Sequence, residues 1–306
     1  MIDSWFGFKR PTATYLYYWA IANLAANVLL VVTGGAVRVT DSGLGCPTWP
    51  QCTSGSVTPH AAMGIHGLIE FGNRMLTWVL VVIAIATWVA AMRRVPVDRL
   101  SRRLATGVAM GVPLQAIVGG ITVLTNLNPW IVAFHFLATM VIISLATWMV
   151  VHTGSAARGP DAGEPGATDA ESAVLRRFGV LLAWALYALT WVTIYLGTVV
   201  TGSGPHAGDI KAHRNGLEPT QATQLHVDAV WTLVGLTAAL ILLAVAAVPS
   251  LRRAALIFGG VIVVQGIIGY VQYAAGLPEV LVILHMFGSA LLMIGATQLV
   301  LATTRR

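Results

Sequence analysis

The sequence has few charged residues, and acidic residues are the scarcest of them. Charged side chains make up 10% of the 306 residues, and Asp and Glu together number 12. Soluble globular domains carry roughly 25% charged residues, so this chain has too few to cover a water-exposed surface. The shortage excludes soluble enzymes and indicates an integral membrane protein.

Cysteine is scarce too, because the chain contains only Cys46 and Cys52. Two cysteines exclude a scaffold of several disulfides and a cysteine-rich metal cluster, and the missing Cys-x-x-Cys-His motif excludes covalently attached c-type haem. A cleavable signal peptide is not expected, since the first apolar run is too long and lacks a small-residue cleavage site.

Hydrophobic residues, in contrast, make up 57% of the chain, and the mean hydropathy is +0.77. A helix needs about 20 apolar residues to cross a hydrocarbon core of about 30 Å. Runs of that length lie near 17–38, 62–92, 104–125, 130–152, 175–200, 224–248, 254–274 and 279–302. We therefore predict an all-α membrane protein with eight transmembrane helices in the lipid bilayer.

The basic residues predict the orientation of these spans. When successive loops are assigned alternately to the two sides, 14 of the 18 Lys and Arg residues fall on one side. Cytoplasmic loops carry the excess of Lys and Arg, so we expect a protein of the cell membrane with both termini in the cytoplasm. The net charge of +6 follows from this asymmetry and does not indicate a nucleic-acid partner.

A polar stretch divides the spans into two halves. Residues 153–172 are mostly small or polar and predict a cytoplasmic linker between an N-terminal half, 1–152, and a C-terminal half, 173–306. The halves repeat one motif at a constant offset of 150 residues, with Gln and Gly four residues apart and a histidine sixteen residues later, at His135 and His285. Because each half has four spans, both share one orientation. We predict two pseudo-symmetric four-helix bundles.

Four histidines are predicted to lie inside the membrane near its outer side. They are His66, His135, His226 and His285, each within the first two turns of a span that enters from outside. A single membrane histidine usually bonds a neighbouring helix, but a pair repeated in both halves favours a ligand with two axial positions, such as haem iron. Zinc is disfavoured because neither pair has a third protein ligand nearby.

The halves differ in their acidic residues. On the helical face of His66, spacings of four, seven and eight residues select Glu70, Asn73 and Arg74, whereas the matching positions after His226 are apolar. An ion pair with Arg74 and a catalytic role are equally good interpretations of Glu70, and they are compatible. We predict that the first half carries out chemistry and that the second holds a redox or structural cofactor.

The segment between the first two spans contains Cys46 and Cys52, separated by turn-forming Pro residues. Two cysteines this close on the oxidising outer face can form a short disulfide ring. We favour a structural disulfide, and a redox role remains the alternative, since strained, exposed disulfides are the labile ones.

Together these features closely resemble the heme A synthase family, as an actinobacterial-type member. The resemblance rests on residues 34–52 (GGAVRVTDSGLGCPTWPQC), on residues 69–74 (IEFGNR) and on the repeated Gln and His spans, and it extends over nearly the whole chain. It implies an eight-span enzyme that oxidises the C8 methyl group of heme O to the formyl group of heme A for terminal oxidases. Heme O synthase and terminal oxidase assembly factors are the implied partners, and an oligomer is possible.

The resemblance also implies roles for individual residues. The N-terminal half would bind the substrate heme O and the C-terminal half haem b. Glu70 falls on the family's catalytic acid, with Arg74 beside it, and His135 and His285 fall on two of its axial haem ligands. Cys46 and Cys52 match the family's loop cysteines, whereas a second cysteine pair that many bacterial members carry between spans five and six is missing.

Two positions depart from the family pattern. Asn73 and Leu233 stand where the better-known members have further axial histidines, and His66 and His226 lie seven residues earlier, about 10 Å nearer the outside. We predict that His66 and His226 have replaced these ligands, with Asn73 as a further haem contact.

Two other functions fit part of the pattern. A di-haem b-type electron-transfer protein would need the four histidines but not Glu70. A transporter would explain the parallel repeat, but the spans lack mid-membrane Gly/Pro breaks, and the chain has no phosphate-binding loop. An assay for heme O conversion separates the first alternative, and an absorption spectrum separates the second.

Overall fold

The structure is a computed structural model that describes residues 11–158 and 172–304. These residues contain eight long helices, each long and apolar enough to cross a membrane. The helices are α1 (Ala13–Val39), α2 (Gly64–Arg93), α3 (Arg99–Leu124), α4 (Pro129–Arg158), α5 (Ala173–Ser203), α6 (Pro219–Ala246), α7 (Pro249–Ala274) and α8 (Glu279–Thr303). The predicted all-α, eight-span membrane protein is thereby confirmed.

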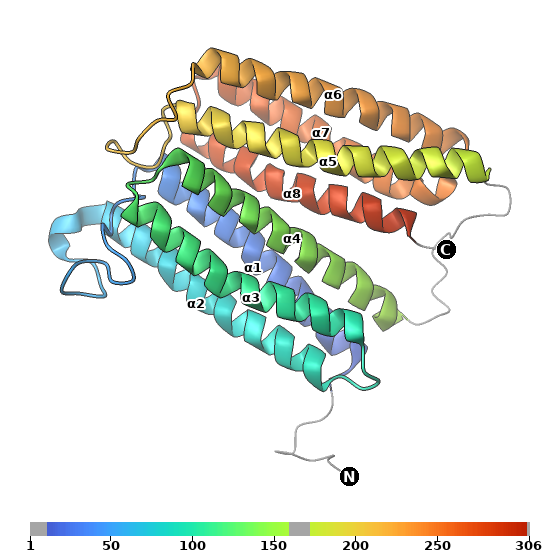
Figure 1. Cartoon of the computed structure of the whole chain (residues 1–306), viewed down its shortest axis with the longest axis horizontal. Coiled ribbons are helices and arrows are strands. Elements are labelled where there is room, and N and C mark those ends of the chain that lie inside the picture. The colour runs from blue at the N-terminus through green and yellow to red at the C-terminus, as the bar shows by residue number, and fades with distance from the viewer. Residues whose placement is uncertain (1–10, 159–171, 305–306) are drawn as a thin grey trace, which may run out of the picture.

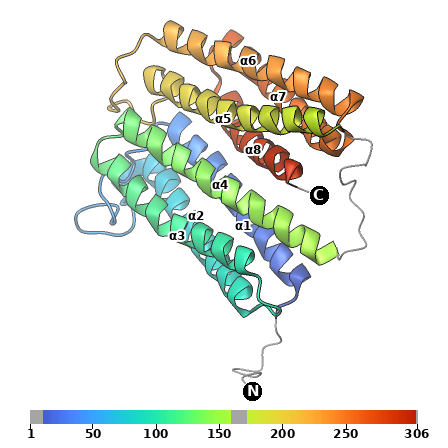
Figure 2. The same cartoon turned by 45° about the vertical axis from the view of Figure 1, so that its right-hand side comes forward.

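The helices lie in two groups, α1–α4 and α5–α8 (Figures 1 and 2). Helix α8 of the second group packs against α1 and α4 of the first, and α4 also contacts α5. A cluster of buried side chains joins the groups, and its members are Val31, Met140, Ile143, Ile194, Ala290 and Met293. The predicted pseudo-symmetry of the two groups stays a prediction.

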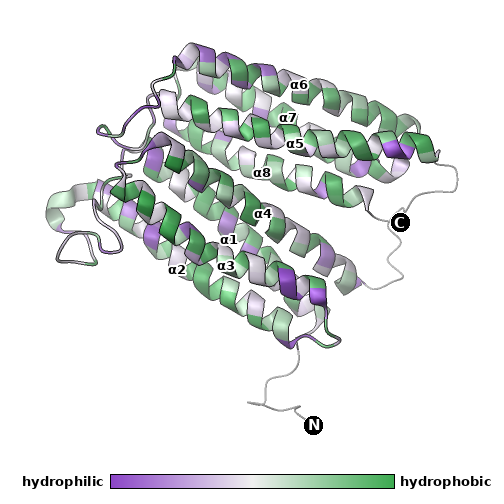
Figure 3. Cartoon of the chain, viewed as in Figure 1, coloured by the Kyte–Doolittle hydropathy of each residue, from purple (hydrophilic) through white to green (hydrophobic). Residues whose placement is uncertain are grey.

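The surface of the bundle is suited to lipid. Large hydrophobic side chains are exposed on the outer faces of the helices, including Trp78, Val82, Leu181, Leu242 and Val263. Figure 3 shows that the long middle parts of the helices are mostly hydrophobic. Lipid hydrocarbon can cover such a surface, whereas exposing it to water would cost free energy.

The connection between α1 and α2, residues 40–63, projects at one end of the bundle (Figure 1). We call this end the loop end. Helices α1, α3, α5 and α7 finish there, and α2, α4, α6 and α8 begin there. The residues of the candidate site lie towards the loop end, in the early turns of the even-numbered helices, the late turns of the odd-numbered ones and the α1–α2 connection.

Helix α4 is longer than predicted, since it continues to Arg158 rather than ending at residue 152. The first six residues of the predicted linker are therefore helical. The Thr153 hydroxyl donates to the Met149 carbonyl at 2.7 Å. At Gly154 an added Cβ would lie 2.9 Å from the Tyr17 ring, so this glycine lets α4 pack closely on α1. Most of the remaining predicted linker, 159–171, lies outside the described residues.

At the opposite end of the bundle, Asp98 caps the start of α3. Its carboxylate accepts hydrogen bonds from the backbone N–H groups of Leu100 and Ser101, each at 3.1 Å, and forms ion pairs with Arg94 at 2.7 Å and His152 at 2.9 Å. Burial by itself raises the pKa of Asp98, but the hydrogen bonds from Ser101 and His152 outweigh it and lower the pKa to about 2. The carboxylate is therefore charged in the folded protein.

Replacing Asp98 with Ala is expected to destabilise the protein by about 1 kcal/mol, the usual cost of losing an N-cap. Thermal unfolding in detergent at pH 7 measures the effect, and Asp98→Asn, which keeps a capping oxygen, separates capping from charge. The pKa is lowered in the folded state, so the stability from the charge is present above about pH 4 and is lost as the pH falls towards 2. Equal unfolding temperatures for all three proteins at pH 7 would contradict the assignment.

Candidate functional site

Two histidines face each other in the second helix group. The ring centres of His226 on α6 and His285 on α8 are 6.4 Å apart, with ring planes at 80°. Imidazole nitrogens bind a metal ion at about 2 Å, which puts the centres of two rings on opposite sides of one ion about 6 Å apart. The spacing of this pair therefore fits two axial ligands of one iron.

The orientation of His226 leaves one nitrogen free for such a bond. Its Nδ1 lies 3.0 Å from the Thr193 carbonyl oxygen. A carbonyl can only accept, so Nδ1 carries the hydrogen, and the lone pair remains on Nε2. Metal-binding histidines are commonly oriented by a hydrogen bond of this kind.

Three of the four predicted histidines rest against a glycine of the preceding helix. An added Cβ at Gly119, Gly197 or Gly269 would lie 3.3 Å from the Cε1 atom of His135, His226 or His285, respectively. The Gln of the repeated motif adds a second matching contact, because Gln115 donates to the His135 carbonyl at 3.1 Å and Gln265 to the His285 carbonyl at 2.9 Å.

Each of the two histidines of the repeat has a nitrogen without a hydrogen-bond partner among the described residues. Nδ1 of His135 and Nδ1 of His285 are buried and make no hydrogen bond to the described residues. Polar atoms buried without a partner are rare and need an explanation. The glycine contacts of His226 and His285, the free Nε2 of His226 and the spacing of the two rings together make the second helix group a good fit for haem.

His66 is placed differently from the other three. It is an exposed residue in the first turn of α2, and its Nδ1 lies 3.1 Å from the Ser42 hydroxyl. Gly35 of α1 faces Met286 and not His66. Among the described residues, no ring contact like that of the second group joins His66 to His135. The structure thus brings one predicted histidine pair together, and the ligand pair of the first half stays a prediction.

The two family positions without histidine are both engaged in packing or hydrogen bonding. The Asn73 side-chain oxygen accepts a hydrogen bond from the Thr33 hydroxyl at 2.8 Å. Leu233 is buried in the hydrophobic core of the second group. A contact between Asn73 and haem stays a prediction.

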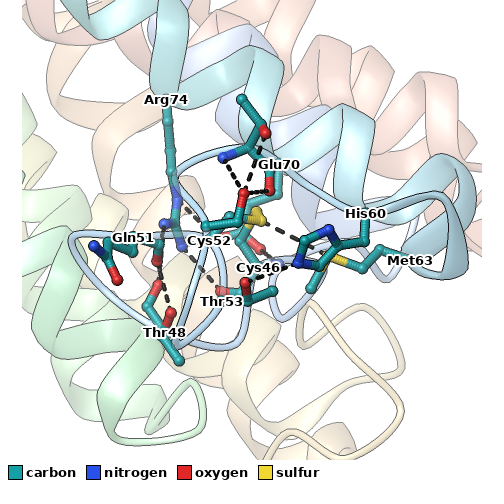
Figure 4. The surroundings of a disulfide bond; sticks show 11 residues. Cys46, Thr48, Gln51, Cys52, Thr53, His60, Met63, Glu70 and Arg74 are labelled. Carbon is teal, nitrogen blue, oxygen red and sulfur yellow. Dashed lines mark hydrogen bonds and ion pairs between the residues drawn. A yellow bond between two sulfur atoms is a disulfide. The ribbon is translucent and has the colours of Figure 1, made fainter.

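Glu70 and Arg74 form an ion pair that holds the α1–α2 connection. Glu70 is buried, and its Oε2 accepts from the backbone N–H of Cys46 at 2.5 Å. Arg74 donates to the carbonyls of Cys46 and Thr48, each at 3.0 Å, and of Gln51 at 3.3 Å. Figure 4 shows both side chains directed at this loop. The ion-pair interpretation of Glu70 is therefore confirmed, and a catalytic role, which is compatible with it, is untested.

The same loop contains the predicted disulfide, which the structure confirms between Cys46 and Cys52 (Figure 4). Both cysteines are completely buried. Trp49, between them, packs its ring on Gly120 of α3, where a Cβ has no room. The ring of residues closed by the disulfide is thus fixed to α2 by Arg74 and to α3 by Trp49.

Alkylation tests the disulfide directly. In membranes never exposed to a reductant and dissolved in SDS, neither Cys46 nor Cys52 is expected to react with iodoacetamide, and peptide mapping should recover the two linked. After reduction both should be labelled. Labelling of both thiols without reduction would show that the loop is held in another way.

Comparison with known proteins identifies the family of this chain. A family model described as cytochrome oxidase assembly protein, COX15-CtaA, matches residues 17–297. The chain belongs to this family. Among relatives, heme A synthase of Symbiobacterium thermophilum is 30% identical over 193 residues, which cover 60% of this chain and 58% of that protein.

Other members of the family are similar at the same level. Heme A synthase of Lysinibacillus sphaericus is 32% identical over 123 residues, covering 40% of this chain and 39% of that protein. Heme A synthase of Listeria welshimeri is 27% identical over 200 residues, covering 61% and 58%. The chain thus matches less than two thirds of the length of these relatives.

Sequence reasoning missed several residues that complete the site of this family member. Ser42 contacts His66, Thr193 orients His226, and the Cys46 N–H binds Glu70. Two of these three contacts use backbone atoms, which leave no signature in side-chain patterns. Gly119 and Gly269 could have been identified from the sequence, because the repeated motif contains them.

Proposed function

We propose that this chain is a heme A synthase of the cell membrane, which oxidises the C8 methyl group of heme O to the formyl group of heme A. Its family membership and the names of its relatives support the reaction. The observation that carries the proposal is the difference between the two helix groups. One has a histidine pair at axial-ligand spacing, and the other has a buried carboxylate, Glu70, on α2.

In this proposal the two halves have different tasks. The C-terminal half, 173–306, would hold haem b between His226 and His285, and the Thr193 carbonyl, by accepting from Nδ1, would leave Nε2 of His226 free to bind it. When bound, haem b supplies a one-electron redox centre. The N-terminal half, 1–152, binds heme O with His135 and His66, and residues 153–172 connect the halves on the cytoplasmic side, where both termini lie.

Glu70 has the chemistry that the oxidation of a methyl group needs. Conversion to an aldehyde removes protons from the carbon, and a positioned carboxylate can accept them or orient a water molecule. Arg74 and the Cys46 N–H fix its two oxygens, so the group is pre-oriented rather than mobile. A carboxylate oxygen can accept two hydrogen bonds, so Oε2, which accepts from the Cys46 N–H, can accept one more.

The proposal is tested by haem extraction and mass analysis of cells that make heme O, with and without this chain. Heme A should appear only with the chain. Haem b bound to the purified protein without any heme A would instead support a di-haem electron-transfer protein, which the His226–His285 pair also fits. Heme O synthase and terminal oxidase assembly factors are the proposed partners, and co-purification in mild detergent tests them together with the oligomeric state.

A further inference from the structure

Arg38, at the loop end of α1, is a cation with no acidic partner among residues 11–158 and 172–304. Its Nε donates to the His206 carbonyl at 2.6 Å, and its Nη2 donates to the Thr201 carbonyl at 3.2 Å. Both acceptors are neutral backbone groups. The ion pairs among the described residues, Arg74–Glu70, Arg94–Asp98 and His152–Asp98, do not include it.

The guanidinium of Arg38 has hydrogen-bonding capacity left. Arginine has five N–H donors, and two of them are used. A charged group in a membrane protein is costly unless it is paired, and such residues commonly mark binding sites. The unused donors and the uncompensated charge together call for an anion, and a carboxylate fits the planar fork of a guanidinium best.

Two neighbours place Arg38 close to the histidine pair. Its acceptor Thr201 lies four residues beyond Gly197 on α5, and Gly197 is the glycine against which the His226 ring rests. Along the helix axis, Arg38 therefore lies about one turn, about 5.4 Å, nearer the loop end than His226.

The contacts of α1 with α8 place Arg38 at a similar distance from His285. On α1, Arg38 lies three residues beyond Gly35, and an added Cβ at Gly35 would be 3.1 Å from the sulfur of Met286. Met286 directly follows His285 on α8. Arg38 thus lies about one turn from His285 as well, again towards the loop end.

A second arginine lies beside the first. Arg214 donates to the Pro205 carbonyl at 3.0 Å, and Pro205 directly precedes His206, the residue whose carbonyl binds Arg38. Arg214 is exposed. The two guanidinium groups therefore meet at one loop segment, with the partly buried Arg38 nearer the histidine pair.

From this arrangement we propose that Arg38, with Arg214 on its solvent side, binds the propionate carboxylates of the haem held between His226 and His285. The inference rests on the proposed haem b site and adds its anion-binding residues. Because Arg38 belongs to the first helix group and both histidines to the second, the bound haem would join the two groups.

The test uses purified full-length protein carrying Arg38→Gln, which keeps hydrogen-bond donors but removes the charge. The dissociation constant for haem b should rise about tenfold or more, as expected for losing a charged hydrogen bond. The reduction potential of haem b should fall, since a nearby positive charge favours the reduced state. Arg38→Lys should keep the potential near that of the unchanged protein. Lys211→Gln, which removes one positive charge from an exposed position of the α5–α6 connection, is the matched control.

A second measurement needs no variant and covers the case in which Arg38→Gln does not fold. Haem b dimethyl ester, whose propionates are blocked, should bind the unchanged apoprotein about tenfold or more weakly than haem b. Equal binding of ester and free acid, or an unchanged affinity and potential in folded Arg38→Gln, would overturn the proposal. So would a defect confined to heme O binding. Full haem b content in His226→Ala would instead refute the haem b assignment itself.

Discussion

Glu70→Gln is expected to lower heme A formation by about 100-fold or more, the range for losing a general acid or base, while haem b stays bound. The substitution keeps the shape of the side chain and an oxygen for the Cys46 N–H, but it removes the negative charge and the capacity to accept a proton. Extracted haems quantified by mass spectrometry give the product, and the absorption spectrum of the same preparation gives haem b.

The structure makes a control for the loop necessary, because Glu70 also holds Arg74 and the α1–α2 connection. The disulfide should remain closed in Glu70→Gln, as judged by alkylation in SDS. Asp228→Asn makes the same carboxylate-to-amide change at an exposed position of α6, and we expect it to form heme A normally. Normal heme A formation by Glu70→Gln would restrict Glu70 to its structural role in the loop.

His226→Ala and His285→Ala are each expected to abolish most of the haem b absorption of the purified protein. Either change removes one of the two proposed axial ligands, whose rings face each other at 6.4 Å. The reduced-minus-oxidised spectrum should lose the band of a bis-imidazole low-spin haem. His213→Ala, at an exposed histidine of the α5–α6 connection, should retain it. Unchanged haem content in both α6 and α8 variants would place the haem elsewhere.

The fold could be predicted from the sequence because a membrane leaves few choices. Backbone groups in a single span through hydrocarbon are paired within a helix. Each long apolar run was therefore expected to be a helix. Helix ends could not be predicted as well, since hydropathy marks the hydrocarbon layer and not the helix. α6 begins at Pro219, where Glu218 caps it, five residues before the predicted span at 224. α3 likewise begins after the Asp98 cap, at Arg99 instead of 104.

The candidate site could be predicted in part. The internal repeat pointed to His135 and His285, and helical spacing placed Glu70 beside Arg74, as the structure has them. The surroundings of His66 could not be foreseen, because its contact with Ser42 depends on how the 40–63 connection folds back onto α2. Helical periodicity describes one helix at a time and carries no information about such a loop.

The glycines under the histidine rings restrict how this site can change during evolution. A histidine moved along its own helix would no longer lie against Gly197 or Gly269, which now leave room for its ring. A ligand position can therefore shift only together with a second substitution on another helix. Residue pairs in contact tend to covary, so among relatives whose ligand stands at the position of Leu233, we expect the small residue on the preceding helix to have moved by about two turns as well.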